Sequence, residues 1–309
     1  MNKIFKTLDE QISILENKGM IIDDVDAAKE ILLRENYFFI TCYRFLFMKS
    51  MTDRTFVAGA RFRELYGVFN FDRQVRNILF KNLLIVENNL KSIISYHLSK
   101  EYGIRESDYL NPNNFNNNPE KRRQINDLIN KMKRQIRSNA DSHTATQHYS
   151  TRYGYIPLWI AVKVLSFGIV SELYLILKPS DQKEIASFFN LEADELATYL
   201  PVLANYRNLC AHEEILFDHR VQRKIDNNRF HLKLDIPKMN NEYIYGKDDL
   251  FALIIILKQM LRKEDFNVLI KELDYEISLL NGKLESISIG KVLDKMGFPS
   301  NYLEIEGID

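Results

Sequence analysis

The chain has 309 residues, of which 46% are hydrophobic, and its 42 Lys and Arg residues balance 42 Asp and Glu residues. That length can bury a large core in one or two domains. The zero net charge excludes a general electrostatic attraction to nucleic acid or anionic membrane, so any such binding must come from a local patch. The two cysteines, Cys42 and Cys210, are too few for a disulfide framework and favour a reducing cytoplasm.

The first hundred residues are predicted to be helical. Residues 1–19 form an amphipathic pattern without the apolar core of a signal peptide, and a second helix is predicted at about 24–34. The aromatic-rich segment 36–47 fits either a buried helix or a strand, and its helical surroundings favour helix. A long periodic stretch at about 62–102 contains no proline, and Gly103 is a reasonable stop.

A basic segment follows an Asn- and Pro-rich loop at 111–120. Residues 121–137 have the apolar periodicity of a helix and contain seven cations against Asp127 alone. The segment is either a solvated helix face or a positive stripe that follows an RNA backbone. The second alternative is considered because nearly all of its charges are positive. The apolar stripe is Ile125, Leu128, Ile129, Met132 and Ile136. The predicted RNA-binding residues are Lys121, Arg122, Arg123, Lys131, Lys133, Arg134 and Arg137.

The next segments are also predicted to be helical. Residues 156–177 are expected to form one strongly apolar helix at the centre of the core. Asp181 with Glu184 fits a capping box that opens a short helix, and a further helix begins near Glu192.

The last part of the chain mixes the two patterns. The period-two alternation of residues 229–236 predicts a short strand or hairpin, and helices are expected at about 248–262 and 265–280. The apolar run 250–257 is too short to span a bilayer, so we expect a buried helix and no membrane partner. The predicted fold is therefore mainly all-α. Its predicted parts are N-terminal helices at 1–55, a helical core at 56–226, and a β excursion with helices at 227–309.

The spacing of ligand-type residues predicts neither a metal site nor a cofactor. His143 and His148 lie five residues apart in a polar loop, where ordinary surface histidines are the favoured interpretation. Gly168 is a single glycine in an apolar helical pattern, not part of a glycine-rich phosphate loop.

The stretch "PVLANYRNLCAHEEILFDHR", residues 201–220, places an arginine, an asparagine and a histidine on one predicted helix. Asn208 and His212 are four residues apart and share a face, and the long side chain of Arg207 can reach the same patch. These residue types fit metal-independent attack of an RNA 2′-hydroxyl on the adjacent phosphate. Arg207 would stabilise the phosphorane, His212 would act as acid or base, and Asn208 would orient the imidazole or bond to RNA. The alternative is a polar helix patch that makes structural hydrogen bonds.

The motif and its context resemble a known family. "RNLCAH" resembles the R-N-x-x-x-H motif of HEPN-domain ribonucleases, and the flanking sequence is similar to the Abi-like family of bacterial abortive-infection proteins, the AbiD and AbiF type. The resemblance covers roughly residues 30–220. It rests on "FDRQVR" (71–76), "IVENNLKSIISYHLSKEYG" (85–103), "HY" (148–149), "PLW" (157–159), "LSFG" (165–168) and "LPVLANYRNLCAH" (200–212).

The resemblance implies an antiparallel HEPN helical bundle with extra helices at both ends. It also implies a phage-defence role in which RNA cleavage stops growth of the infected cell, with Arg207 and His212 catalytic and Asn208 in support. The departures concern substrate preference and rate: Lys163 stands where a glutamate is common, Glu213 where a second histidine is common, and Ile215 where an arginine is common.

Several alternatives stay open on the sequence. A non-catalytic RNA-binding protein would use the same patch as a phosphate clamp, and a purely structural interaction protein would have no RNA affinity. Glu87 either faces the same cleft or is an ordinary surface carboxylate, which is the favoured interpretation. A ribonuclease also needs a restraint in a healthy cell, either a partner protein or a bound regulatory RNA.

The predicted chemistry implies a homodimer with a composite active site. Cleavage needs both a base and an acid, but the motif offers one histidine per chain. His219 lies two helical turns further on and His231 lies in the expected strand, so neither is an obvious partner. A two-fold axis beside the motif helix would bring a second His212 and a second Arg207 to the same phosphate. Small Cys210 and Ala211 would allow the helices to approach closely there.

Overall fold

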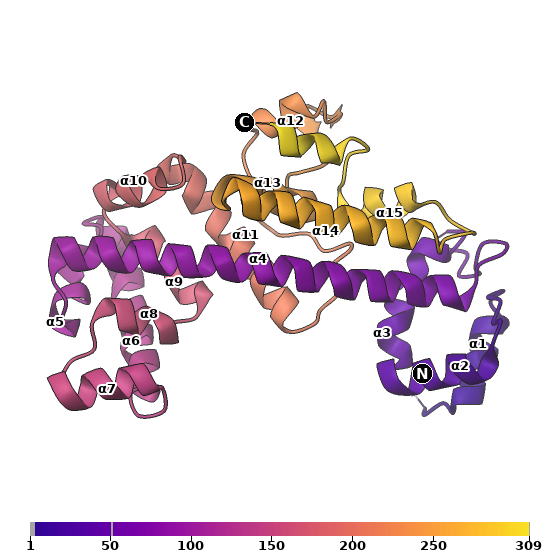
Figure 1. Cartoon of the computed structure of the whole chain (residues 1–309), viewed down its shortest axis with the longest axis horizontal. Coiled ribbons are helices and arrows are strands. Elements are labelled where there is room, and N and C mark those ends of the chain that lie inside the picture. The colour runs from indigo at the N-terminus through magenta and orange to yellow at the C-terminus, as the bar shows by residue number, and fades with distance from the viewer. Residues whose placement is uncertain (1–3, 51, 309) are drawn as a thin grey trace.

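A single long helix organises the computed structural model, which describes residues 4–50 and 52–308. Helix α4 (Phe62–Tyr102) runs along most of the molecule, and the other helices lie beside it or gather at its ends (Figure 1). It ends where predicted, at Gly103, whose φ of 105° lies in a region that favours glycine. The buried residues of α4 recur at three- and four-residue steps, as expected for a helix at the centre of a core.

The N-terminal helices gather at one end of α4 (Figure 1). Their starts follow from capping residues: Thr7 and Glu10 form a capping box, and Asp24 accepts a hydrogen bond from the Ala27 amide. The segment 36–47 is helical, as favoured over a strand. The elements are α1 (Leu8–Glu16), α2 (Val25–Glu35), α3 (Tyr37–Thr41) and the 3₁₀ helix η1 (Cys42–Phe47).

Shorter helices surround the other end of α4 (Figure 1). They are α5 (Glu106–Tyr109), η2 (Pro112–Asn114), η3 (Pro119–Lys121), α6 (Arg122–Ser138), α7 (Thr144–Tyr153), α8 (Leu158–Val164), α9 (Phe167–Ile176) and α10 (Pro179–Ser187). The basic helix α6 buries the whole predicted apolar stripe, which confirms its amphipathic pattern. Helices α8 and α9 pack against both α4 and α6.

The prediction of one helix over 156–177 is wrong, because the chain breaks between α8 and α9. Leu165 is extended, and the Ser166 side chain accepts a hydrogen bond from the Ile169 amide to begin a new helix. Serine favours this capping position over a helix interior, since its hydroxyl can bond to the local backbone. The Ser166 amide in turn donates to the Gln135 side chain on α6.

The predicted capping box of Asp181 and Glu184 is also wrong. Helix α10 begins earlier, with Pro179 in its first turn. Asp181 is instead buried, where its carboxylate accepts hydrogen bonds from the Tyr102 hydroxyl (2.7 Å) and from His97 Nε2 (2.9 Å). These bonds attach α10 to the end of α4, a tertiary role that local spacing does not reveal.

Helix α11 (Ala193–Ala211) crosses α4 near its middle and packs against α4, α9, α10 and α13 (Figure 1). The chain then passes through α12 (Arg229–Lys233), strands β1 (Lys238–Met239) and β2 (Glu242–Tyr243), α13 (Leu250–Met260), α14 (Lys263–Asn281), α15 (Ile289–Met296) and η4 (Tyr302–Gly307). Helix α14 lies along α4, and every residue of the 250–257 run is buried. In the described part of the chain, no helix is both long and apolar enough to cross a bilayer.

The predicted strand at 229–236 is wrong, although a small hairpin follows it. Asn228 caps α12 by accepting a hydrogen bond from the Phe230 amide, and Phe230 and Leu234 are buried one helical turn apart. Leu232, which the alternation would have buried, is exposed. The antiparallel pair forms later, with Lys238 opposite Tyr243. The mainly all-α class is confirmed, while the predicted division into 1–55, 56–226 and 227–309 stays a prediction.

Candidate active site at the end of helix α11

The motif histidine lies where helix α11 ends. The Glu214 amide donates to the Leu209 carbonyl (3.1 Å) and the Glu213 amide to the Cys210 carbonyl (3.4 Å), which is the Schellman arrangement of a helix C-terminus. Glu213 has a φ of 55°, in the left-handed region, so the chain reverses direction directly after His212. This reversal leaves the His212 side chain exposed at the tip of the helix.

The three predicted catalytic residues differ in how they are held. Asn208 and His212 are exposed, and their side chains form no hydrogen bond to any residue that the structure describes. The two residues are joined only through the backbone, where the His212 amide donates to the Asn208 carbonyl (3.0 Å). Arg207 is half-buried and points toward α4. The predicted bond by which Asn208 would orient the imidazole is therefore not formed.

An ion cluster on α4 holds Arg207. Its Nε–H donates to Glu87 Oε2 (3.0 Å), and Lys91 Nζ lies 2.7 Å from the other oxygen of the same carboxylate. The guanidinium also lies 5.8 Å from the centre of the Phe80 ring. The Arg207 side chain keeps 28% of its surface exposed, and its Nη groups form no hydrogen bond to the described residues. A planar fork with free outer donors is the arrangement that suits a phosphate.

The interpretation of Glu87 as an ordinary surface carboxylate is wrong, because only 5% of this residue is exposed. Glu87 lies on the buried face of α4 between Leu83 and Leu90. A signal for this position was present in the sequence: Glu87 and Lys91 are an i, i+4 ion pair inside an apolar run. A charged pair in that setting indicates a partnered, buried site.

A second buried network, which the sequence analysis missed, positions the chain after His212. Asp72 Oδ2 accepts hydrogen bonds from the Tyr43 hydroxyl (2.7 Å), the Leu216 amide (3.2 Å) and the Arg76 guanidinium. Arg76 also donates to the Glu214 carbonyl (3.1 Å). Burial raises the pKa of Asp72 to about 6, although the charge of Arg76 opposes the shift. The available signal was the Asp–Arg pair at i, i+4 within "FDRQVR".

His219, His231 and Cys210 are bonded or buried within the fold. His219 Nε2 lies 2.7 Å from Asn205 Oδ1, and burial lowers the pKa of His219. His231 is buried in the C-terminal part, and its Nε2–H donates to the Gly246 carbonyl (2.8 Å). Burial raises the pKa of Cys210 to about 12, so this thiol stays protonated at neutral pH. Neither His219 nor His231 bonds to a motif residue.

The predicted RNA-binding residues lie apart from the motif. Helix α6 is at one end of α4, whereas α11 crosses near the middle (Figure 1). Three of the cations have partners: Lys131 pairs with Glu172 (3.0 Å), Arg123 lies 3.8 Å from Asp127, and Lys121 donates to a backbone carbonyl. Those with neither an ion pair nor a side-chain hydrogen bond to a described residue are Arg122, Lys133, Arg134 and Arg137. Across residues 4–50 and 52–308, no group of three His, Cys, Asp or Glu side chains could hold a metal ion.

A known protein family matches more than half of the chain. The model of the family described as Abi-like protein matches residues 30–218, a range that includes the Asp72 network, the Glu87 cluster and the whole motif. No curated protein and no solved structure matches the chain.

Proposed function

The chain belongs to the Abi-like protein family, and from this premise we propose that it acts in abortive infection, a form of phage defence, as a metal-independent HEPN-type endoribonuclease. The observation that supports this proposal best is the contrast within the motif. Arg207 is fixed by the buried Glu87 carboxylate, whereas Asn208 and His212 are exposed without protein partners. Polar side chains with no structural bond are available to a substrate.

The proposed reaction uses the 2′-hydroxyl of the RNA itself. A base removes the proton of the 2′-hydroxyl, the oxygen attacks the adjacent phosphorus, and an acid protonates the departing 5′-oxygen. The Nη groups of Arg207 donate to the non-bridging oxygens as negative charge increases in the phosphorane. His212 acts as acid or base, and Asn208 donates to the RNA. The products carry a 2′,3′-cyclic phosphate and a 5′-hydroxyl.

A cleavage assay tests the proposal. Purified protein is incubated with single-stranded RNA in EDTA, and product ends are identified by mass spectrometry. His212→Ala and Arg207→Ala should abolish cleavage and cellular toxicity, and His212→Ala should keep the melting temperature, because the imidazole has no structural bond. Glu214→Gln is the matched control, since this exposed side chain lies two residues from His212. Unchanged cleavage by His212→Ala would place the active site elsewhere.

The same assay separates the runner-up function, RNA binding without cleavage. In that case the protein should shift RNA in a native gel while the RNA stays intact, and Arg207→Ala should weaken the shift through loss of a phosphate contact. If the RNA stays intact after prolonged incubation with protein that binds it, RNA binding without cleavage would replace the ribonuclease proposal. Sequencing RNA that copurifies with the protein would identify a bound regulatory RNA.

We further propose that the site is completed by a second copy of the chain, because each motif supplies one histidine for two proton transfers. The segment next to the motif has an aromatic surface that a second copy would cover, since Phe38, Phe39 and Phe45 are exposed. The same segment lies beside the motif because the ring of Tyr43 packs against that of Phe217, with 5.2 Å between the ring centres. Exposed aromatic clusters of this kind are typical of interfaces. Of the two small residues in the motif, Ala211 is exposed and Cys210 is buried within its own chain, so a close approach of two motif helices would use Ala211.

Dilution tests the composite site. Sedimentation and specific activity are measured over one concentration series, and activity should fall as dimer dissociates. Phe39→Ser should shift both curves to higher concentration, whereas Tyr275→Ser, which changes an exposed aromatic residue on α14, should not. Constant specific activity in protein shown to be monomeric would refute the shared site.

A further inference from the structure

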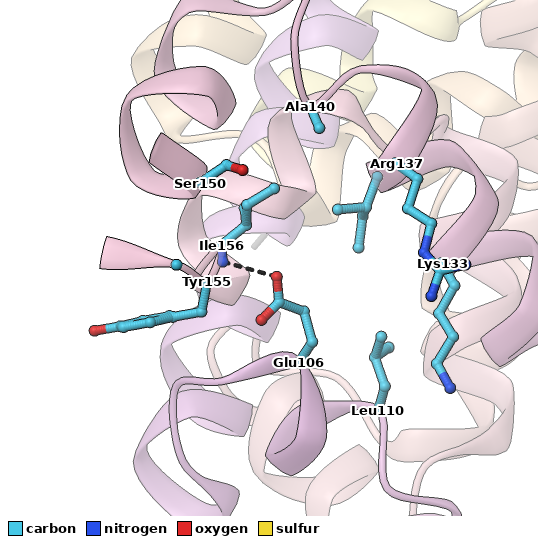
Figure 2. A pocket seen from close by; sticks show the side chains of 10 residues that line it. Glu106, Leu110, Lys133, Arg137, Ala140, Ser150, Tyr155 and Ile156 are labelled. Atoms are coloured by element: carbon cyan, nitrogen blue, oxygen red, sulfur yellow. Dashed lines mark hydrogen bonds between the residues drawn. The ribbon is translucent and has the colours of Figure 1, made fainter. Parts of the chain in front are cut away.

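A separate cavity of about 320 Å³ lies between α5, α6 and the segment that follows α7 (Figure 2). It is at the end of α4 where the short helices gather, away from the crossing of α11 (Figure 1). Its size is at the lower end of the range for small-molecule sites, so it can hold one compact ligand and not a base pair. Nothing in the proposed ribonuclease reaction uses it.

One wall of the cavity is cationic. Lys133 and Arg137 are one turn apart on α6, and both side chains lie on the same side of the cavity in Figure 2. Neither cation forms an ion pair with a described residue, unlike Lys131, which pairs with Glu172 on the same helix. The wall therefore has two cationic side chains that form no direct ion pair with a carboxylate.

The opposite wall carries one carboxylate in a fixed position. Glu106 Oε1 accepts a hydrogen bond from the Ile156 amide (2.7 Å), and Figure 2 shows this carboxylate on the side of the cavity opposite the cations, turned toward Ile156. The Tyr109 hydroxyl donates to the Ile156 carbonyl (2.8 Å), so both polar groups of that residue are held. Glu106 Oε2 has no such bond and can accept one from a ligand.

Apolar side chains lie between the two charged walls. Leu110, Ile136 and Ile156 are buried residues that line the cavity. A ligand that fits must therefore have an anionic group on one side, an apolar body, and a hydrogen-bond donor on the other side. A phosphate monoester has several charged oxygens and a charge close to −2 at neutral pH, so one such group can pair with both cations at once.

We propose that this cavity binds a nucleotide, either free or at the phosphorylated end of an RNA strand. Lys133 and Arg137 bind the phosphate, the base packs against the apolar side chains, and Glu106 accepts from the base or the sugar. The Tyr155 ring points out of the cavity in Figure 2 and lies 6.5 Å from the Tyr153 ring. These outer aromatic rings offer a stacking surface to a strand that continues beyond its terminal nucleotide.

Calorimetric titration of the full chain with AMP, GMP, CMP and UMP tests the proposal, with the matching nucleosides as controls. At least one nucleotide should bind about tenfold or more tightly than its nucleoside, the factor expected from a charge-assisted hydrogen bond. The double variant Lys133→Gln/Arg137→Gln should lose that difference. The matched control Lys100→Gln/Lys183→Gln removes two positive charges from exposed positions on α4 and α10 but no lining residue, and should bind like the wild type.

Equal affinity for nucleosides and nucleotides, wild-type binding by Lys133→Gln/Arg137→Gln, or no binding of any mononucleotide would each overturn the proposal. These outcomes do not depend on RNA cleavage, so they leave the proposed ribonuclease activity untouched. Competition with 2′-O-methyl oligonucleotides, which cannot be cleaved through a 2′-hydroxyl, identifies the source. Preference for a 5′-phosphorylated strand, weakened by Tyr153→Ala, would assign the cavity to RNA ends, and indifference to the strand would assign it to free nucleotides.

Discussion

Glu87→Gln should destabilise the protein far more than removal of a surface carboxylate. The change keeps the size of the side chain but removes the charge between Lys91 and Arg207. The Lys91 side chain, which is 9% exposed, then keeps an ammonium charge without an anionic partner. Removing one partner of a buried ion pair costs about 3–5 kcal/mol, and the more exposed Arg207 adds about 0–1 kcal/mol at most. We therefore expect a loss of about 3–5 kcal/mol in the free energy of unfolding.

Urea denaturation monitored by circular dichroism measures this loss. The matched control is Glu272→Gln. Glu272 on α14 pairs at 2.7 Å with Lys81, which lies on α4 like Glu87, but both side chains of this pair are well exposed. That variant should lose about 0–1 kcal/mol. The double variant Glu87→Gln/Lys91→Met should recover most of the stability, since no unpaired buried charge remains. Equal losses in the two single variants would refute the conclusion that Glu87 and Lys91 form a buried, energetically coupled pair.

Three further predictions concern the backbone, pH and salt. Glu213→Gly should stabilise the protein by up to about 1 kcal/mol in the same urea assay. Glycine removes the conformational strain of a left-handed backbone, and this gain exceeds the cost of the extra entropy that glycine gives the unfolded chain. Glu213→Ala keeps the strain and should give no gain. Burial lowers the pKa of His231, so as the pH falls the unfolded chain binds a proton at a higher pH than the folded chain does. The free energy of unfolding should therefore be highest above pH 6.5 and decrease below it. His231→Gln should reduce that decrease. For single-stranded RNA, log affinity should fall with log salt by roughly 0.7 per phosphate contact. Replacing Arg122, Arg123, Lys133 and Arg134 with Gln should flatten this dependence on salt. An unchanged slope would show that α6 is only a solvated face.

The sequence predicted most elements of the fold, because helical periodicity is a local property. The bounds of α4, the apolar face of α6 and the buried α13 all follow from patterns that a single helix must satisfy. The errors occurred where tertiary contacts decide. Residues 229–236 alternate over too few positions to separate strand from helix, and Asn228 capping with burial of Phe230 selected the helix.

The sequence predicted the residue types of the site, but it did not predict the distant residues that hold them in position. The spacing of Arg207 and His212 is visible in the chain, whereas the contact of Arg207 with Glu87 joins residues 120 positions apart. The same holds for Asp72, which reaches the Leu216 amide across 144 positions. Spacing arguments describe one helix at a time, so they cannot show which face of α4 lies behind α11.

The two buried networks explain how an exposed motif can still be well positioned. Glu87 fixes the guanidinium of Arg207 from behind, and Asp72 with Arg76 fixes the chain that leaves His212, both from the one rigid helix α4. Substitutions in the networks should therefore lower stability and activity together, because they leave buried charges unpaired. Substitutions of the exposed motif side chains should lower activity alone, because those side chains have no structural bond to lose. That difference in stability separates the residues that would act on RNA from the residues that hold them in place.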